Sequence, residues 1–363
     1  MGLGEQALIG HLRETIRRRG PVTFAWFMEQ TLYHPEHGYY GSGRAAIGRG
    51  GDYFTSVSVG PLFGRLLAAQ FAEMWVLLGR PHDFAIIEQG AHSGELARDV
   101  LLAAQSDHPE FFGAISYVIV EPFALWQARQ RSVLAELALK ADWRNTVAEL
   151  APFRGVHFSN ELIDAMPFHL VTWTGAEWLE RHVTTNGDSF TFIDRPLSDG
   201  TLEERLEQVP RSLPSGYVTE LNLAALQWIE ALAEKLTAGW ILTADYGYKR
   251  EEFYAPHRSA GTLRACANHQ GLPSPLAHVG QADITAHVDW TSLAEQAVAR
   301  GLTARGFADQ HHFLTGLLAT KTGQELASSA DAKTTRGLHT LMHPGFLGMK
   351  FQFLALARNV PDE

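Results

Sequence analysis

The sequence has a single cysteine, Cys266, among its 363 residues. One thiol excludes an internal disulfide and any metal or iron–sulfur site built from several cysteines. No apolar run approaches the roughly 20 residues needed to cross a bilayer, and no signal-peptide core is present. Basic residues are outnumbered, 30 Lys and Arg against 40 Asp and Glu, which argues against a broad nucleic-acid-binding surface. We therefore expect a cytoplasmic protein with neither membrane nor nucleic-acid partners.

Three catalytic patterns are missing as well. A nicotinamide-binding loop needs Gly-x-Gly-x-x-Gly and an acid about 20 residues further on, whereas Glu121 lies too far beyond Gly90. The Gly-x-Ser-x-Gly elbow of hydrolases is absent, because Gly90 precedes Ser93 by one position too many. Close histidine pairs such as His311-His312 match no zinc spacing, and 17 histidines make chance pairs common. We expect no metal.

The sequence does contain a strand, a glycine turn and a helix in succession, at residues 84–104. An apolar run ends in Glu88, the turn carries Gly90 and Gly94, and apolar side chains then recur at helical spacing. Glycine lets the backbone approach a ligand closely, and a helix start presents unpaired N–H groups. The stretch therefore predicts a nucleotide-type pocket.

Further strands with polar ends follow in the same part of the chain. An apolar run at 117–120 ends in Glu121, and another at 155–159 is followed by Asn160 and Glu161. Strands that alternate with helices predict parallel pairing with right-handed crossovers. Such sheets bind ligands beyond the carboxyl ends of their strands, where these polar residues fall. We expect Glu121 to accept hydrogen bonds from a ribose diol.

Several short motifs occur in a fixed order along nearly the whole chain. They are Leu32-Tyr33-His34-Pro35, Gly38-Tyr39-Tyr40, Gly51–Ser56, Glu88–Gly94, Asn160–Pro167, Asp245-Tyr246-Gly247, Gly261-Thr262-Leu263-Arg264 and Asp283–Asp289. In this order they resemble the MidA-like family of S-adenosylmethionine-dependent methyltransferases. Mitochondrial members of that family are arginine methyltransferases that assist assembly of respiratory complex I.

The resemblance implies a fold and a cofactor. The fold is α/β, of the class I, Rossmann-like methyltransferase type, with a mostly parallel seven-stranded sheet, one antiparallel strand and helices on both faces. An N-terminal helical segment, a β-meander and irregular insertions add to it. The cofactor is S-adenosyl-L-methionine, which becomes S-adenosyl-L-homocysteine, and the family likeness also implies a homodimer.

Four segments are expected on this basis. Residues 1–82 supply N-terminal helices and a loop, rich in glycine and aromatic residues, that forms the cofactor lid. Residues 83–167 form the first half of the cofactor-binding core, and residues 168–218 an inserted β-meander. Residues 219–363 form the second half of the core, with an irregular substrate-side insertion at 249–290. Within the last segment we expect a helix over 219–237.

Two positions depart from the family pattern. The middle glycine of its Glu-x-Gly-x-Gly-x-Gly loop is His92 here, which costs roughly 1 kcal/mol if the position needs a positive φ. The family's Thr-Ser-Pro-Glu is Thr55-Ser56-Val57-Ser58, so a carboxylate expected near the lid is missing. Both changes leave cofactor binding expected and leave the methyl acceptor open.

By this resemblance we assign the cofactor site and the catalytic residues. Glu88, Gly90 and Gly94 are expected at the methionine end, with the lid residues closing over it and two further residues at strand ends. The full cofactor set is Gly51, Asp52, Thr55, Glu88, Gly90, Gly94, Glu121 and Asn160. The catalytic candidates are Glu161, Asp164 and His287.

The catalytic candidates follow from the chemistry of an arginine acceptor. Carboxylates such as Glu161 and Asp164 can orient a guanidinium and localise its charge, and His287 can act as a base. The alternative is that Asp164 caps a helix and Glu161 is solvated. For His287, as for His269, a structural imidazole held by a carboxylate such as Asp289 is the alternative.

The predicted function is transfer of a methyl group from S-adenosylmethionine to a partner protein, plausibly at arginine. Two other functions stay open. One is a methyltransferase of the same fold that acts on a small molecule, which the altered lid and His92 favour. The other is a non-catalytic factor in which bound S-adenosylmethionine has only a structural role and whose function is to bind a partner.

Overall fold

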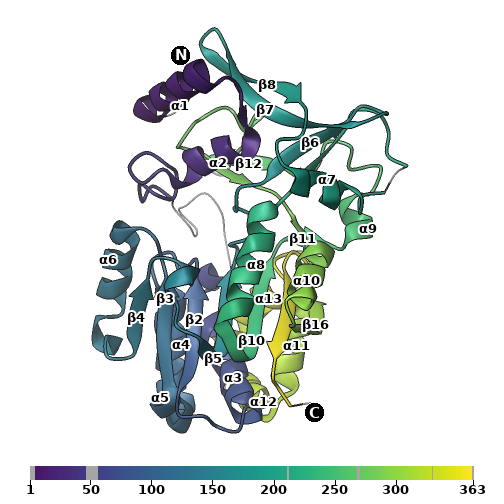
Figure 1. The fold of residues 1–363 in the computed structure, drawn as a ribbon. Coiled ribbons are helices and arrows are strands. Elements are labelled where there is room, and N and C mark those ends of the chain that lie inside the picture. The colour runs from purple at the N-terminus through teal and green to yellow at the C-terminus, as the bar shows by residue number, and fades with distance from the viewer. Residues whose placement is uncertain (1–4, 46–55, 211, 268–269, 329, 362–363) are drawn as a thin grey trace. The chain divides into compact units, whose positions relative to one another are not determined.

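The structure is a computed structural model that describes residues 5–45, 56–210, 212–267, 270–328 and 330–361. The chain forms two compact units, each drawn from three stretches of sequence (Figure 1). Unit 1 consists of Met1–Tyr53, Ile163–Gln227 and Gly247–Ser292, and unit 2 of Phe54–Leu162, Trp228–Tyr246 and Leu293–Glu363. The four segments expected from the sequence stay a prediction.

Unit 2 is built on a seven-stranded sheet of order β16-β17-β10-β5-β2-β3-β4. Its strands are β2 (Phe84–Gln89), β3 (Ile115–Val120), β4 (Ala141–Arg144), β5 (Phe153–Asn160), β10 (Leu236–Asp245), β16 (Thr303–Asp309) and β17 (Gln352–Arg358). β17 runs antiparallel to both β10 and β16, and the other neighbours pair in parallel. The mostly parallel seven-stranded sheet with one antiparallel strand is therefore confirmed.

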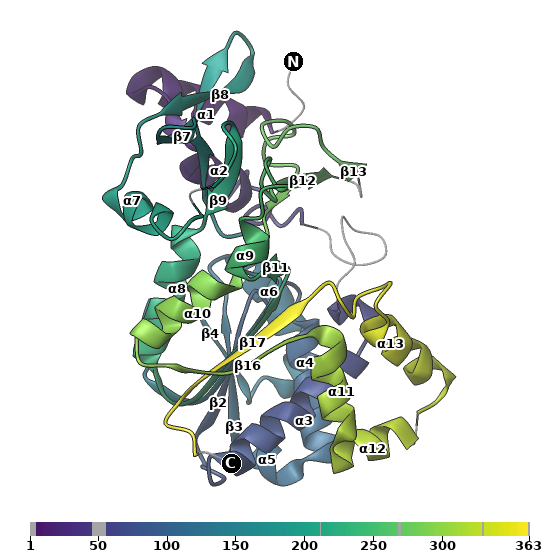
Figure 2. The same cartoon turned by 90° about the vertical axis from the view of Figure 1, so that its right-hand side faces the viewer.

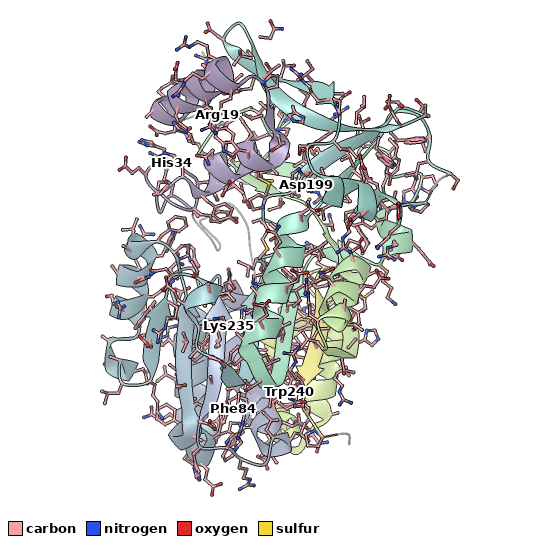
Figure 3. The ribbon with its side chains drawn as sticks, in the orientation of Figure 1. Arg19, His34, Phe84, Asp199, Lys235 and Trp240 are labelled. Carbon is pink, nitrogen blue, oxygen red and sulfur yellow. The ribbon has the colours of Figure 1, made fainter. Side chains whose placement is uncertain are left out.

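Helices cover both faces of this sheet, which Figure 2 shows nearly edge-on. On one face lie α3 (Leu62–Leu77), α4 (Glu95–Asp107), α5 (Pro109–Ala114), α11 (Gln310–Ala319), α12 (Lys321–Ser328) and α13 (Ala332–Met342). The ends of α8 (Leu223–Lys235) and α10 (Trp290–Ala299) that belong to unit 2 lie on the other face. Figure 3 labels Phe84 at the start of β2 and Lys235 at the end of α8.

The core of unit 2 explains why these elements pack together. Helix α3 places apolar side chains at helical spacing, so that Phe63 and Phe71 reach Phe158 of β5, with ring centroids 6.5 and 5.9 Å apart. All three phenylalanines are buried. Burial of one such side chain contributes about 1.5–3 kcal/mol, so this cluster fixes α3 against the middle of the sheet.

Unit 1 contains a five-stranded antiparallel sheet made of β1 (Val22–Thr23), β6 (His169–Trp173), β7 (Trp178–Asn186), β8 (Ser189–Arg195) and β9 (Tyr217–Leu221). Strands β7 and β8 form a hairpin around Gly187, whose φ of 56° suits glycine. Helices α1 (Gln6–Arg19) and α2 (Phe24–Tyr33) precede the meander in the chain. Thr23 caps α2 by accepting a hydrogen bond from Trp26 N, as its sequence position predicts.

The prediction of a helix over 219–237 is wrong at its start. Residues Tyr217–Leu221 form β9, which pairs with β6 and completes the meander. The helix, α8, begins only at Leu223, after Asn222 has accepted a hydrogen bond from Ala225 N on its side-chain oxygen at 2.9 Å. Pairing in the sheet thus overrides the helical pattern of this stretch.

The remaining part of unit 1 contains short elements. These are α7 (Gly200–Leu206), α9 (Arg250–Phe253), β11 (Gly247–Tyr248), β12 (Arg264–Ala267), β13 (Gln270–Gly271), β14 (Asp283–Thr285) and β15 (Val288–Asp289). Strands β13, β12 and β14 form a small sheet, and β11 pairs with β15. Among the helices of the described ranges, none combines the length and the apolar character that a membrane span requires.

Candidate active site

The loop after β2 has the backbone geometry of a ligand-binding turn. Gly90 and Gly94 have φ values of 80° and 86°, in the region that only glycine adopts readily. A Cβ on Gly90 would lie 3.3 Å from the side chain of Leu162, and one on Gly94 would lie 3.3 Å from Gln130. Helix α4 starts directly after Gly94, so its first N–H groups border the loop. Both glycines are therefore required by conformation and by space.

His92 lies between these glycines with a φ of 45°, so this position does need a positive φ. A left-handed conformation costs such a residue about 1–2 kcal/mol. The imidazole packs on the ring of Trp126 with centroids 4.3 Å apart, and the guanidinium of Arg129 lies 4.4 Å from the centroid of the same indole. Stacking of this kind contributes about 0.5–1.5 kcal/mol and offsets much of the strain.

Gln130 on α6 (Ala124–Val133) joins three parts of the site and was not singled out from the sequence. Its side chain is fully buried. The amide nitrogen donates to His92 O at 2.8 Å and to Glu121 Oε2 at 3.2 Å, and the amide oxygen accepts from Trp143 Nε1 at 2.9 Å. One amide thus fixes the glycine loop, the acid after β3 and the edge strand β4. A glutamine within a helix gives no sequence signal for such a role.

Glu121 follows β3 and presents a buried carboxylate of fixed orientation. Its Oε1 accepts from Phe123 N at 3.1 Å, and its Oε2 accepts from the Gln130 amide. Burial raises the pKa of Glu121 to about 7, and these two hydrogen bonds act in the opposite direction. The carboxylate is therefore ready to accept donors from a ligand, but it ionises only near neutral pH.

Glu88 lies near the end of β2 and is buried. Its Oε2 accepts from the hydroxyl of Tyr117 on β3 at 2.7 Å. Burial raises the pKa of Glu88 to about 7, while the Tyr117 hydrogen bond lowers it. Burial, together with the neighbouring carboxylate, also raises the pKa of Tyr117. The hydrogen bond from Tyr117 therefore fixes the orientation of a second buried acid, just before the glycine loop.

Asn160 ends β5 and Glu161 directly follows it, as expected. Glu161 has a φ of 52°, and its carboxylate accepts from Asn160 Nδ2 at 3.0 Å and from the Tyr246 hydroxyl at 3.4 Å. The Oδ1 of Asn160 is buried and has no hydrogen-bond partner among the residues that the structure describes. A buried acceptor left in this state costs about 1–3 kcal/mol, which a donor from a ligand would recover.

Asp245, at the end of β10, is a further residue that the candidate set lacks. Its carboxylate is fully buried, and it accepts from Leu162 N at 3.2 Å and from Tyr246 N at 2.8 Å. It therefore ties the loop after β5 to the loop after β10. Its position at a strand end was visible in the sequence, whereas its partners were not.

These groups of unit 2 fit S-adenosylmethionine. Gly90 and Gly94 carry no side chains that would keep a ligand away from the backbone of the turn. The polar groups at the strand ends are mostly acceptors: Glu88, Glu121 and Asn160 Oδ1, which is unpaired among the described residues. Acceptors suit the ammonium group and the ribose hydroxyls of this cofactor. The structure thus brings together in unit 2 Glu88, Gly90, Gly94, Glu121, Asn160 and Glu161.

Asp164 and His287 belong to unit 1, where Ala286 N donates to Asp164 O at 2.9 Å and so brings their two loops together. Asp164 is buried and lies in a turn rather than at a helix start. The alternative of a helix-capping Asp164 is therefore wrong. The three lid residues Gly51, Asp52 and Thr55, like His269, lie outside the described residues.

His287 is held by its backbone and by ring stacking. Its N–H donates to Thr262 Oγ1 at 3.0 Å, and its ring stacks on Tyr248 with centroids 4.8 Å apart. Burial, reinforced by Arg264 and Arg258, lowers the pKa of His287 to about 4, so the imidazole is neutral at pH 7. The carboxylate of Asp289 accepts from Ser292 N and from the Ser292 hydroxyl at the start of α10.

Glu220 is a buried acid of β9 that organises the motif at 261–264. Its carboxylate accepts from Thr262 N at 2.7 Å and from Leu263 N at 2.8 Å, and Thr262 in turn holds His287. Gly261 has a φ of 73°, and a Cβ there would collide with the Glu220 carboxylate. Burial raises the pKa of Glu220.

Within the described ranges, no three His, Cys, Asp or Glu side chains gather as a metal site.

A parallel sheet with one reversed strand, a glycine turn after β2 and acids at the strand ends together define a class I methyltransferase. The chain belongs to the family described as "Putative S-adenosyl-L-methionine-dependent methyltransferase", whose model matches residues 66–308. It is thus an enzyme that uses S-adenosyl-L-methionine as its cofactor and releases S-adenosyl-L-homocysteine.

Individual relatives are similar to this chain over most of their length. The "Protein arginine methyltransferase NDUFAF7 homolog, mitochondrial" of Drosophila melanogaster is 27% identical, over 97% of this chain and 85% of that protein. The human "Protein arginine methyltransferase NDUFAF7, mitochondrial" is 26% identical, over 96% and 83%. A Burkholderia thailandensis protein described as a "likely methyl transferase", crystallised with S-adenosyl-homocysteine, is 29% identical with a TM-score of 0.88, over 98% and 93%.

These relatives contradict the cytoplasmic location that we expected from the sequence. The proteins from Drosophila melanogaster, Mus musculus and Homo sapiens are all mitochondrial. The expectation relied on the lack of a membrane-spanning run and of a signal-peptide core. Those two absences describe which segments a chain lacks, and they carry no information about the compartment in which it works.

Proposed function

We propose that this methyltransferase transfers the methyl group to an arginine side chain of a partner protein. The observation that carries the proposal is the geometry of Glu161, the residue after β5. Its backbone has a φ of 52°, and its carboxylate accepts hydrogen bonds from Asn160 and Tyr246. Backbone strain of this kind costs about 1–3 kcal/mol and tends to cluster at active sites. The names of the Drosophila and human relatives support arginine as the acceptor.

A fixed carboxylate suits this acceptor for a chemical reason. The guanidinium of arginine is planar and positively charged, and none of its nitrogens has a free lone pair while the charge is delocalised. A carboxylate that binds one edge through paired, charge-assisted hydrogen bonds orients the group and localises that charge. In this proposal Glu161 binds and orients the acceptor. The catalytic roles of Asp164 and His287 stay predictions, and the low pKa of His287 supports a neutral, accepting imidazole.

The cofactor side of the proposal rests on the groups of unit 2. S-adenosylmethionine, when bound, supplies a methyl group activated by a sulfonium. Gly90 and Gly94 allow close approach of the backbone, Glu88 and Asn160 complete the methionine end, and Glu121 accepts from the ribose hydroxyls. Alignment of donor and acceptor alone can supply on the order of 7–11 kcal/mol.

Transfer of labelled methyl groups tests the proposal. We would incubate the protein with tritiated S-adenosylmethionine and lysate from cells that lack it, and then hydrolyse the labelled protein. Methylarginine in the hydrolysate is the expected product. Label only in small molecules would support the small-molecule enzyme instead, and cofactor binding without transfer would support the non-catalytic factor.

A variant links the product to Glu161. We expect Glu161→Gln to lower the transfer rate at least 100-fold while the affinity for S-adenosylmethionine changes by less than about threefold, since one charge-assisted interaction with the acceptor is lost. Glu136→Gln, which changes an exposed acid of the same unit, is the matched control. Equal transfer rates for the two variants would contradict the role of Glu161.

A further inference from the structure

The β-meander of unit 1 has a pocket to which none of the roles above is assigned. Its volume is about 660 Å³, which is the size of a small-ligand site. One wall comes from the hairpin of β6 and β7, and the other from α7 and the segment after it. Asp199, labelled in Figure 3, caps α7 by accepting from Thr201 N at 2.8 Å, which fixes the second wall.

Two tryptophans form the aromatic side of this pocket. Trp173 ends β6, Trp178 begins β7, and the two residues are direct cross-strand partners. Their ring centroids lie 5.4 Å apart with an interplanar angle of 48°, and both side chains are half-buried. Buried Leu206 and Leu213 also line the pocket. The pocket therefore offers aromatic faces above an apolar base.

Three carboxylates give the pocket its charge. Glu177, Glu203 and Glu207 line it and are exposed. Within the part of the chain that the structure describes, none of these carboxylates has an ion-pair partner. Glu203 and Glu207 are four residues apart along α7 and its cap, and like charges at that spacing destabilise a helix by about 0.2–0.5 kcal/mol. A cation in the pocket would relieve this repulsion.

Aromatic faces combined with unpaired carboxylates select one kind of side chain. Arginine stacks its flat guanidinium on an indole and pairs its N–H groups with carboxylates, whereas lysine is a compact point charge. The same chain already makes such stacks: the guanidinium of Arg131 lies 3.9 Å from the ring centroid of Trp143, and that of Arg258 lies 3.7 Å from that of Tyr248. The formal net charge of −10 also favours a basic ligand.

We propose that the pocket between Trp173, Trp178 and α7 is a docking site for an arginine in a basic segment of the partner protein. This arginine is distinct from the one that accepts the methyl group. The inference rests on the proposed function only in taking a polypeptide as the partner. Docking at this pocket would raise the local concentration of the acceptor segment without contributing to the chemical step.

Peptide binding without cofactor tests the docking site directly. The probe is a dye-labelled nonapeptide of glycine and serine with one central arginine, compared by fluorescence anisotropy with a peptide that has neutral citrulline at that position. We expect saturable binding of the arginine peptide and at least tenfold weaker binding of the citrulline peptide. Equal binding of the two peptides, or no saturable binding of either, would overturn the inference.

Matched variants locate the binding in the pocket. The double variant Glu203→Gln/Glu207→Gln should weaken binding of the arginine peptide at least fivefold, and Trp178→Leu at least tenfold. Glu204→Gln, which changes an exposed acid of the same helix outside the pocket lining, should leave binding unchanged. Thermal unfolding checks that each variant is folded. If Glu204→Gln weakens binding as much as the double variant, general charge attraction explains the binding and the site is overturned.

Methyl transfer separates this inference from the proposed function. With a methylated partner protein in hand, the double variant should raise KM for that protein at least fivefold and leave kcat and cofactor affinity unchanged. An unchanged KM would overturn the docking site while the proposed function stands. Specific binding of the arginine peptide by a protein that methylates only small molecules would overturn the proposed function while the docking site stands.

Discussion

Unit 2 and unit 1 assemble their polar residues in different ways. In unit 2, Glu88, Glu121 and Asn160 each follow or end a strand of one parallel sheet, so the topology brings them to the same edge. In unit 1 the five-stranded sheet is antiparallel, and Thr262 and His287 flank the paired strands β12 and β14, where buried Glu220 holds Thr262 in place. In unit 2 the topology of the sheet gathers the polar residues, whereas in unit 1 hydrogen bonds to a buried acid also order the loop that carries Thr262.

The largest effect should come from Gln130, which joins three parts of the site in unit 2. Gln130→Met removes three hydrogen bonds and leaves the indole N–H of Trp143 and the carbonyl of His92 without this partner. At about 1–3 kcal/mol for each buried group, we expect the free energy of unfolding to fall by about 3 kcal/mol or more, with roughly tenfold weaker cofactor binding. Urea unfolding and calorimetric titration measure both. Gln105→Met, at an exposed position of α4, is the control, and a loss as small as in this control would contradict the role of Gln130.

The next effect concerns the ribose acceptor. Glu121→Ala removes a buried carboxylate that is already held by Phe123 N and Gln130. Loss of hydrogen bonds to a charged group costs about 2–3 kcal/mol, so we expect cofactor affinity to fall roughly 30- to 100-fold in isothermal titration. Glu136→Ala should leave it unchanged. A change of less than threefold for Glu121→Ala would remove Glu121 from the cofactor site.

A matched pair of glycines compares the two units directly. Gly94→Ala places a methyl group against Gln130 at a φ of 86°, and Gly261→Ala places one against Glu220 at 73°. Each change costs about 1–2 kcal/mol of strain before any clash. We expect Gly94→Ala to weaken cofactor binding about tenfold, whereas Gly261→Ala should lower the rate of methyl transfer and leave cofactor binding within twofold. Similar losses of cofactor affinity in both variants would show that the two units do not divide the work in this way.

Acid should destabilise unit 2 through one buried histidine. His157 on β5 is fully buried, and neither ring nitrogen has a hydrogen-bond partner within the described ranges. Burial lowers the pKa of His157 from 6.5 to about 3. Below pH 6.5 the imidazole is therefore protonated in the unfolded chain but stays neutral in the folded unit. The free energy of unfolding consequently falls between about pH 6.5 and pH 3. At 1.36 kcal/mol per pKa unit, this loss is about 2 kcal/mol at pH 5.

Hydrogen exchange locates that loss. We expect amides of β5 to lose protection between pH 7 and pH 5, and His157→Leu to remove this dependence. His257→Leu, which removes an exposed histidine of unit 1, is the control. An unchanged pH dependence in His157→Leu would assign the acid sensitivity to other groups.

The smallest effect is the pH dependence of cofactor binding. Burial raises the pKa of Glu121 to about 7, so the carboxylate is mostly neutral at pH 6 and mostly ionised at pH 8. Because the ionised form is the better acceptor, affinity for S-adenosylmethionine should rise roughly tenfold across this range. The rise should be much smaller in Glu121→Gln, and an equally steep rise in that variant would point to Glu88 instead.

The sequence was most informative where the topology of the sheet determines which residues come together. Strands ending in Glu88, Glu121 and Asn160 could be recognised one by one, and the parallel pattern then predicts that they share an edge. The reversed strand and the count of seven came from the family likeness. Periodicity alone wrongly extended α8 back to residue 219, because the stretch at β9 is satisfied by pairing with β6.

Side-chain contacts over long sequence distances were beyond prediction. Gln130 contacts His92, 38 residues away, and nothing in a helical Gln indicates that contact. Glu220 and Thr262 are 42 residues apart, and a carboxylate in an apolar strand gives no hint that it orders a distant loop. The left-handed conformation of Glu161 was equally hidden, because positive φ values can be anticipated for glycine but not for glutamate.

The position of β17 has a consequence for the folding of this protein during its synthesis. β17 is the last described strand in chain order, yet it lies in the sheet between β10 and β16. Until residues 352–358 have left the ribosome, β10 presents an open edge and β16 has no neighbour with which to pair. Open edges invite pairing with other chains, so we expect the nascent protein to need protection by chaperones until β17 has emerged and paired with β10 and β16.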